Sequence, residues 1–160
     1  MSPSAITALV AAREIARAVA GGDDVSQVRI VHNVITSLAV PEIVTELGAV
    51  PVRTRVGHSF IKAEMASAVA VFGGEHSAHY YFRDFWFADT GMLAALHVLA
   101  ALGESDAPLS VLGAAYEIRL SLVGSEMCIR DRSCCARLRP ECRPCPVSYT
   151  HLTLPTSDLV

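Results

Sequence analysis

Strand-like and helix-like segments alternate across residues 28–102, and this alternation limits the chain to a small set of folds. The strand candidates are rich in β-branched or aromatic residues, whereas the segments between them have helical spacing and begin or end at Ser, Pro or Gly. Such alternation is typical of a mostly parallel or mixed sheet that is flanked by helices. We therefore predict a single-domain α/β fold.

The expected elements follow one another in a simple order. A helix at 4–20 precedes a buried strand at 28–36, and Pro41 begins a short helix that Gly48 ends. The later elements are a strand at 50–56, a helix capped by Ser59, strands at 69–73 and 79–86, a helix capped by Asp89 or Thr90 that ends at Gly103, and a helix at 108–117.

Composition divides the chain near residue 118. Residues 1–118 carry 7 Lys and Arg against 12 Asp and Glu, whereas residues 119–160 carry 6 against 4 and hold all five cysteines. The second part shows no sustained period and contains several prolines, so we predict a domain at 1–118 followed by a disordered segment at 119–160. A cysteine-free domain suits a reducing compartment, and we expect a cytoplasmic protein.

Charge and hydropathy argue against two kinds of partner. A net charge of −3 gives no reason to expect nucleic acid as a partner. The Ala-rich first segment is interrupted by Arg13, Glu14 and Arg17, so we interpret it as an amphipathic helix and not as an export signal or membrane span. We expect neither nucleic acid nor a membrane as a partner.

Polar clusters follow the ends of three predicted strands. His32 and Asn33 form the first, Gly57-His58-Ser59 with Lys62 forms the second, and residues 73–79 form the third. In an open α/β sheet, the loops beyond the strand ends converge on one crevice. The three clusters are therefore candidates for a shared site.

The third cluster, GGEHSAH, suits a sugar. Gly73 and Gly74 allow the backbone to approach a ligand closely. Glu75 and Ser77, two positions apart on an extended loop, would point to the same side and offer an acceptor and a donor for vicinal hydroxyls. A polar hairpin loop with solvated side chains is the alternative, and spacing alone does not exclude it.

Two further histidines require interpretation. His58 and Lys62 at the start of a helix would favour a bound anion, unless Ser59 is only a helix cap and Lys62 only an exposed residue. Both interpretations stay open. His97 lies in a helix of Leu and Ala, and we interpret it as structural.

The stretch RTRVGHSFIKAEM … AVFGGEHSAHYYFRDFWFADTGMLAALHVLAAL resembles the third domain of the phosphomannomutase/phosphoglucomutase family, and the resemblance covers residues 2 to 117. The loop G-E-x-S-G-H is that family's sugar-binding loop, and G-H-S followed by Lys is its companion. The family interconverts hexose 1- and 6-phosphates through a bisphosphorylated sugar, with a phosphoserine and one Mg²⁺.

The resemblance implies roles for particular residues. Glu75 and Ser77 would hold the sugar hydroxyls of a mannose or glucose phosphate. His58 and Lys62 would help to neutralise phosphate, and His58 and His79 are weaker candidates for a catalytic role. Ala78 stands where the family usually has Gly, which would tighten the loop and leave the Glu75–Ser77 pair intact.

The parts of the family that perform the chemistry have no counterpart in this sequence. We find no phosphoserine loop, no D-G-D-x-D-R loop with the carboxylates for Mg²⁺, and no C-terminal phosphate loop, so we assign no metal ligand. The resemblance therefore implies a fragment of a phosphohexomutase, inactive alone. The alternative is a free-standing, non-catalytic module that binds sugar phosphates.

The end of the chain differs in kind from the rest. SLVGSEMCIRDR (121–132) and VSYTHLTLPTSDLV (147–160) resemble translated sequencing-adapter sequence, so we expect an artefactual segment whose reading frame is lost between Glu117 and Leu120. An interaction protein with a cysteine-rich tail, or one with a zinc site, is the rival interpretation. The spacing of Cys134, Cys135, Cys142 and Cys145 is not a recognised set of zinc ligands.

Overall fold

The computed structural model describes residues 1–117, which form five helices, two short 3-10 helices and a five-stranded sheet. The helices are α1 (Pro3–Ala20), α2 (Ala39–Glu46), α3 (His58–Ala68), α4 (Gly91–Gly103) and α5 (Leu109–Glu117). The strands are β1 (Arg29–Asn33), β2 (Val50–Thr54), β3 (Phe72–Gly74), β4 (Tyr80–Phe82) and β5 (Ala88–Asp89). The predicted α/β class is confirmed, while the predicted disordered segment at 119–160 lies outside the described residues.

The sheet combines parallel and antiparallel pairing in the order β2-β1-β3-β4-β5. Strand β1 pairs in parallel with both β2 and β3. Strand β4 runs antiparallel to β3, and β5 runs antiparallel to β4. The carboxyl ends of the three parallel strands therefore lie at one end of the sheet, where loops of α/β proteins converge.

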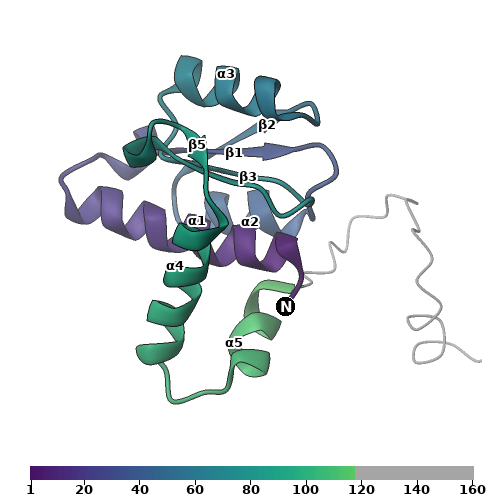
Figure 1. Cartoon of the computed structure of the whole chain (residues 1–160). Helices are drawn as coiled ribbons and strands as arrows, with labels where there is room; N and C mark the ends of the chain where they lie inside the picture. Colours follow the sequence, from purple (N-terminus) through teal and green to yellow (C-terminus); the bar gives the residue numbers. More distant parts are fainter. Residues whose placement is uncertain (118–160) are drawn as a thin grey trace, which may run out of the picture. The chain divides into compact units, whose positions relative to one another are not determined.

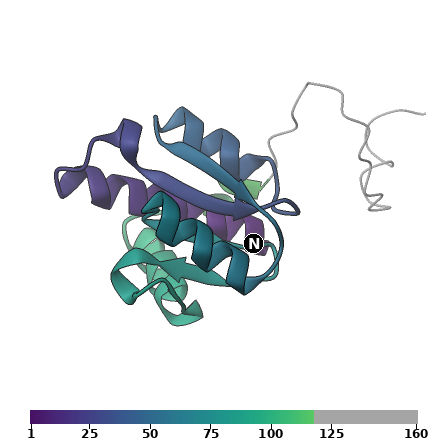
Figure 2. The same cartoon turned by 90° about the horizontal axis from the view of Figure 1, so that it is seen from above.

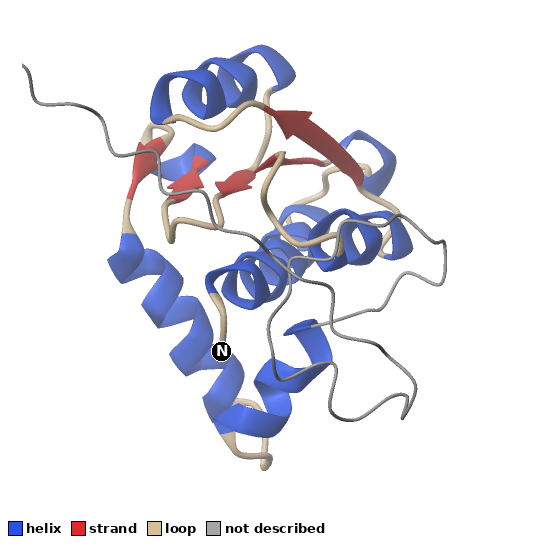
Figure 3. Ribbon diagram, turned by 90° about the vertical axis from the view of Figure 1, so that its right-hand side faces the viewer, coloured by secondary structure: helices blue, strands red, loops and turns tan. Residues whose placement is uncertain are grey.

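Helices cover both faces of the sheet. Helix α3 lies over one face, and α1 and α2 lie over the other (Figures 1 and 2). Helices α4 and α5 contact α1 and extend away from the sheet (Figures 1 and 3). A larger core forms between the sheet and α1, and a smaller one forms under α3 around Ile61 and Met65.

Helix α1 shows how local sequence sets the fold. The side chain of Ser2 accepts a hydrogen bond from the backbone N–H of Ala5, which satisfies one of the donors left open at a helix start. Pro3 occupies the first turn, where a missing N–H costs nothing. Ala8, Leu9 and Val10 then face the core and are fully buried.

Several predicted boundaries were wrong for identifiable reasons. Strand β1 ends at Asn33 because residues 34–36 turn away from the sheet. Strand β3 begins at Phe72, since Val69 closes α3 with left-handed backbone (φ 52°). Ser59 lies inside α3 and does not cap it, because the helix begins directly after Gly57.

Among residues 1–117, none of the helices combines the length and the apolar character that crossing a bilayer requires.

Candidate functional site

Loops from three strands meet at the carboxyl end of the parallel strands, which we call the carboxyl end of the sheet. One loop leaves β2 and enters α3, and residues 75–79 connect β3 to β4. Strand β5 reaches the same end, because Asp89 pairs with Tyr81. Side chains from separate parts of the sequence are thereby brought together.

Glu75 is the central residue of this region. Its side chain is almost fully buried, with 2% of the residue exposed. Oε2 accepts a hydrogen bond from Ser77 Oγ at 2.8 Å, and Oε1 accepts one from the backbone N–H of Gly57 at 3.4 Å. Gly57 is the N-cap of α3, so the carboxylate lies at the positive end of that helix. Glu75 therefore joins the loop after β3 to the loop after β2.

The loop presents its side chains in two directions. Glu75 and Ser77 lie on the same side and bond to each other, as their spacing predicted. His76, between them, instead contacts α1, where its Nδ1 lies 3.0 Å from Ser4 Oγ. The geometric part of the sequence prediction is thus confirmed, and His76 faces a different neighbour.

A tight turn closes this loop. The backbone N–H of Ala78 donates to the carbonyl of Glu75 at 3.2 Å, and the N–H of Glu75 donates to the carbonyl of His79 at 3.0 Å. Ala78 has φ 67°, a left-handed conformation that costs an L-residue about 1–2 kcal/mol. The turn that places Glu75 and Ser77 is therefore locally strained.

The paired glycines have a packing role that the sequence did not indicate. A Cβ at Gly73 would lie 2.6 Å from Met65 Sδ of α3, and one at Gly74 would lie 2.4 Å from Thr7 Cγ2 of α1. The two positions face opposite sides of the sheet and lie directly under a helix on each side. Close packing of these helices therefore requires glycine at both positions of β3.

Two histidines and two further side chains form a cluster beside Glu75. The rings of His58 and His79 meet edge to face with centroids 4.2 Å apart. His79 Nδ1 lies 2.6 Å from Asp89 Oδ2, and His58 Nδ1 lies 2.6 Å from the hydroxyl of Tyr81. Both imidazoles are thus oriented by a neighbour that the fold holds in place.

The environment of Tyr81 suppresses its ionisation. The residue is fully buried, and burial raises the pKa of its hydroxyl well above 10.0. The negative charges of Glu75 and Asp89 raise this pKa further. Tyr81 therefore keeps its proton at neutral pH and stays available for hydrogen bonding to His58.

Sequence reasoning missed Tyr81 and Asp89 as members of this region. The sequence predicts Asp89 or Thr90 as the helix cap, and Thr90 caps α4 by accepting a hydrogen bond from the N–H of Leu93. Tyr81 was part of an aromatic strand, which indicates core packing. Only the pairing of β4 with β5 brings these side chains to the two histidines.

The other predicted site residues are placed less centrally. Lys62 lies on an exposed part of α3, one turn beyond His58. His32 aligns with Gly74 in the sheet, and its Nδ1 contacts the carbonyl of Asn33. Among the described residues, no hydrogen bond or ring contact joins His32 or Asn33 to the histidine cluster. The second and third clusters of the sequence thus meet, whereas His32 lies at the same end of the sheet without a direct contact to them among the described residues.

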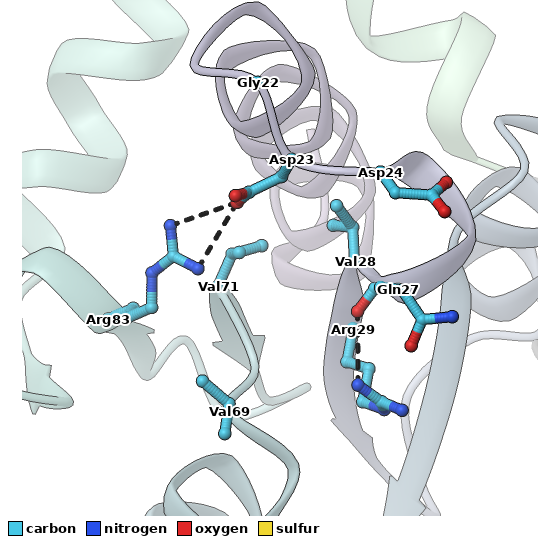
Figure 4. A pocket seen from close by; sticks show the side chains of 9 residues that line it. All are labelled: Gly22, Asp23, Asp24, Gln27, Val28, Arg29, Val69, Val71 and Arg83. Atoms are coloured by element: carbon cyan, nitrogen blue, oxygen red, sulfur yellow. Dashed lines mark hydrogen bonds and ion pairs between the residues drawn. The ribbon is translucent and has the colours of Figure 1, made fainter.

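A different arrangement occupies the amino end of the parallel strands. A pocket of ≈ 370 Å³ opens there, and Arg83 and Asp23 approach each other across it to 3.5 Å (Figure 4). The lining residues are Gly22, Asp23, Asp24, Gln27, Val28, Arg29, Val69, Val71 and Arg83.

Ion pairs connect α1 to the segments that follow β4. Glu14 is buried and accepts hydrogen bonds from Arg17 at 3.0 and 2.7 Å, while His97 Nε2 lies 3.2 Å from its Oε1. Burial alone would raise the pKa of Glu14, but bonds from His97 and Arg17 outweigh it and hold this pKa below 4.5. His97 also stacks on Phe82, so its structural interpretation is confirmed.

The donor atoms at the carboxyl end do not fit Mg²⁺. His58, His79 and Asp89 form a group of three potential metal ligands, whose ligand atoms lie within 4.8 Å of one another. Mg²⁺ prefers six oxygen ligands, whereas this group offers two imidazoles and one carboxylate. His58, His79 and Asp89 therefore do not form an Mg²⁺ site.

Comparisons with known proteins agree with this architecture. The family described as "Phosphoglucomutase/phosphomannomutase, alpha/beta/alpha domain III" matches residues 3–117. A phosphomannomutase of Vibrio cholerae is 43% identical over 74 residues, which cover 46% of this chain and 16% of that protein. A phosphomannomutase of Escherichia coli is 40% identical over 84 residues, which cover 52% of this chain and 18% of that protein.

Solved structures show the same fold. A phosphoglucomutase/phosphomannomutase family protein from Burkholderia thailandensis superimposes with a TM-score of 0.62 at 24% identity, covering 74% of this chain and 24% of that one. This chain spans less than a fifth of the length of the curated relatives it matches. The family match over residues 3–117 covers most of the sequence. The chain therefore belongs to the phosphoglucomutase/phosphomannomutase family and corresponds to its alpha/beta/alpha domain III.

Proposed function

We propose that this chain is the sugar-recognition domain of a phosphohexomutase, which interconverts hexose 1-phosphate and hexose 6-phosphate in the cytoplasm. Membership of the family supports this proposal, as do relatives that carry the name phosphomannomutase. The substrate would be a mannose or glucose phosphate.

The observation that carries the proposal is the bridge that Glu75 forms between two loops. A carboxylate can accept about four hydrogen bonds, and that of Glu75 receives two, one of them long. Acceptor capacity therefore remains on a buried, negatively charged group next to the Ser77 hydroxyl. This combination suits two neighbouring hydroxyls of a hexose, because one can donate to Glu75 while the other bonds to Ser77.

The surrounding residues would serve the phosphate. His58 begins α3, and Lys62 follows one turn later on the same helix. Both would face the anionic part of the substrate, where a cation and a helix start favour negative charge. His79, which Asp89 holds by a 2.6 Å hydrogen bond, would position the sugar or move a proton.

We further propose that this chain alone does not catalyse the mutase reaction. Phosphoryl transfer depends on positioning and charge neutralisation around the transferred group. In the parent enzyme, the phosphoserine and the carboxylates for Mg²⁺ would come from parts of the protein outside this sequence. We expect the purified chain to show no mutase activity with Mg²⁺ and a bisphosphate activator.

A chimera tests the proposal. Residues 3–117 would replace the corresponding domain of the Escherichia coli phosphomannomutase, and kcat/KM would be measured for mannose phosphate. A lost hydrogen bond to a charged group costs about 1.5–3 kcal/mol, so Glu75→Gln should lower kcat/KM by about ten- to a hundredfold. Ser77→Ala removes a neutral bond and should cost less, about 0.5–1.5 kcal/mol.

His76→Ala is the matched control, because His76 lies in the same loop and contacts Ser4 instead of Glu75. Its kcat/KM should stay close to that of the unmodified chimera. An effect of His76→Ala larger than that of Glu75→Gln would mean that the wrong side of the loop has been assigned. Tight binding of mannose phosphate to the isolated chain, with no effect of Glu75→Gln in the chimera, would favour a free-standing binding module.

A further inference from the structure

Three potential metal ligands converge at the carboxyl end of the sheet. His58 is the first residue of α3, His79 directly precedes β4, and Asp89 ends β5. One ligand atom of each lies within 4.8 Å of the other two. Three separate elements thus supply them, and the pairing of β4 with β5 fixes their approach.

The backbone and a buried side chain hold this group in place. Asp89 Oδ1 accepts a hydrogen bond from the N–H of Tyr80 at 2.9 Å, which fixes the carboxylate. The hydroxyl of the buried Tyr81 contacts Nδ1 of His58 at 2.6 Å. Metal-binding histidines usually donate the N–H of their second nitrogen to a hydrogen-bond acceptor, which fixes the orientation of the ring, and the Tyr81 oxygen can serve as that acceptor.

Solvent can reach the group. About a third of the side chain is exposed in both His79 and Asp89, at 36% and 31%. His58 is an exposed residue, and its Nε2 has no hydrogen-bond partner among the residues that the structure describes. A hydrated ion can therefore enter, and water can complete its coordination.

We propose that, in the chain without sugar phosphate, His58, His79 and Asp89 bind a divalent transition metal of the Zn²⁺ type. Two imidazoles and a carboxylate form a donor set that Zn²⁺ accepts readily and that Mg²⁺ does not favour. With Nε2 of His58 on the metal, its Nδ1 would carry a proton and donate it to the oxygen of Tyr81. A water molecule would occupy the fourth position.

The required movement is small. Ligand atoms around tetrahedral Zn²⁺ lie about 3.3–3.5 Å apart, because each metal–ligand bond is about 2.0–2.2 Å long. The pair formed by His79 and Asp89 is closer than this, at 2.6 Å, and the widest separation in the group is below 4.8 Å. Rotation of three side chains that are at least partly exposed can make up these differences.

The experiment uses the full chain with its cysteines alkylated, because all five thiols of the sequence would otherwise compete for metal. Zn²⁺ binding would be measured by calorimetry, and Co²⁺ binding by its visible absorption. We expect one equivalent of either metal to bind, with tetrahedral Co²⁺ spectra free of thiolate charge-transfer bands. An equal concentration of Mg²⁺ should not displace it.

Variants separate this site from binding elsewhere. His58→Ala, His79→Ala and Asp89→Asn should each weaken Zn²⁺ binding by at least about tenfold, since losing even an outer partner of a ligand costs about 10–100-fold. His76→Ala, in the same loop, should bind Zn²⁺ as the unmodified chain does. Equal affinity in all four variants would overturn the proposal, as would failure of the unmodified chain to bind.

A second measurement covers variants that fail to fold. The imidazole resonances of the unmodified chain can be followed by NMR during a Zn²⁺ titration. Those of His58 and His79 should shift together, while those of the buried His32 and of His97, which is paired with Glu14, should not. Shifts confined to other histidines would contradict the site.

Discussion

The polar groups at the two ends of the sheet are joined in different ways. At the amino end, Arg17 bonds to both Glu14 and Asp84, so charges of opposite sign compensate each other. At the carboxyl end, carboxylates face neutral or titratable partners, as Glu75 faces Ser77 and Asp89 faces His79. The charged groups at the amino end satisfy each other, whereas the carboxylates and imidazoles at the carboxyl end can still bind a ligand.

This difference distinguishes polar residues that stabilise the fold from polar residues that can bind a ligand. A carboxylate paired with a guanidinium is already satisfied, because a guanidinium supplies several donors in one plane. A carboxylate that receives one hydroxyl, or an imidazole with one nitrogen open, can still bind a sugar, a phosphate or a metal. Polar residues of the same types therefore support opposite conclusions at the two ends, and only their partners decide which applies.

The largest effect on stability is expected at the amino end. Glu14→Gln removes a buried charge, with 1% of the residue exposed, that bonds to Arg17 and His97. Because hydrogen bonds to charged groups contribute about 1.5–3 kcal/mol, the free energy of unfolding should fall by about that amount. Urea unfolding followed by circular dichroism measures the change as a lower midpoint with unchanged slope.

Glu104→Gln is the matched control for this prediction. Glu104 also pairs with an arginine of α1, Arg13, but its side chain is largely exposed. Exposed ion pairs contribute little to stability, so the midpoint should move much less than in Glu14→Gln. Equal shifts in the two variants would mean that burial of Glu14 does not matter, and that the amino end is no more structural than an exposed surface.

The sequence predicted the fold better than it predicted the site. Strand and helix order follow from local patterns, and Glu75, Ser77 and His58 stand in recognisable loops. Asp89 and Tyr81 could not be assigned, because each joins the site only through antiparallel pairing with a neighbouring strand. The packing role of the two glycines of β3 does not follow from the sequence for a similar reason, since the helices that require them come from distant parts of the chain.

Acid should destabilise the two ends in different pH ranges. Burial, aided by the charge of Arg53, lowers the pKa of His32 below 6.5, although a bond to the backbone of Asn33 opposes this. A group whose pKa is lower in the folded than in the unfolded state stabilises the fold. This stability is complete above the pKa of the unfolded state and is lost as pH falls through the pKa of the folded state. The contribution of His32 to the free energy of unfolding should therefore decrease below pH 6.5, and that of Glu14 below pH 4.5.

Urea midpoints measured from about pH 7.5 down to about pH 3 test this order. His32→Gln should flatten the upper part of the profile, and Glu14→Gln should flatten the lower part. If His32→Gln changes the urea midpoints only at the acidic end of the pH profile, then His32, at the carboxyl end of the sheet, does not cause the loss of stability that begins below pH 6.5.

Ala78→Gly should stabilise the chain slightly, although most substitutions do the opposite. Left-handed backbone costs Ala about 1–2 kcal/mol, and the greater freedom of unfolded Gly offsets about 0.5–1 kcal/mol of the relief. The net gain, about 0–1.5 kcal/mol, should raise the urea midpoint. Ala95→Gly, at an exposed position of α4, should instead cost about 1 kcal/mol. Loss of stability in Ala78→Gly would show that the turn is not strained.

The smallest effect is expected from Asp89→Asn, the counterpart of Glu14→Gln at the carboxyl end. Asn keeps an oxygen for the N–H of Tyr80, so the bond that fixes β5 survives. The variant loses only the charge that faces His79, and both side chains of that pair are about a third exposed. Such a pair contributes about 0–1 kcal/mol, so the urea midpoint should hardly move.

The same variant should nevertheless bind Zn²⁺ at least about tenfold more weakly, because the carboxylate is one of three ligands. A large loss of stability, comparable to that of Glu14→Gln, would mean that Asp89 is a structural residue and that the two ends do not differ in kind. Retained stability with weakened metal binding would place its charge in the function of the carboxyl end.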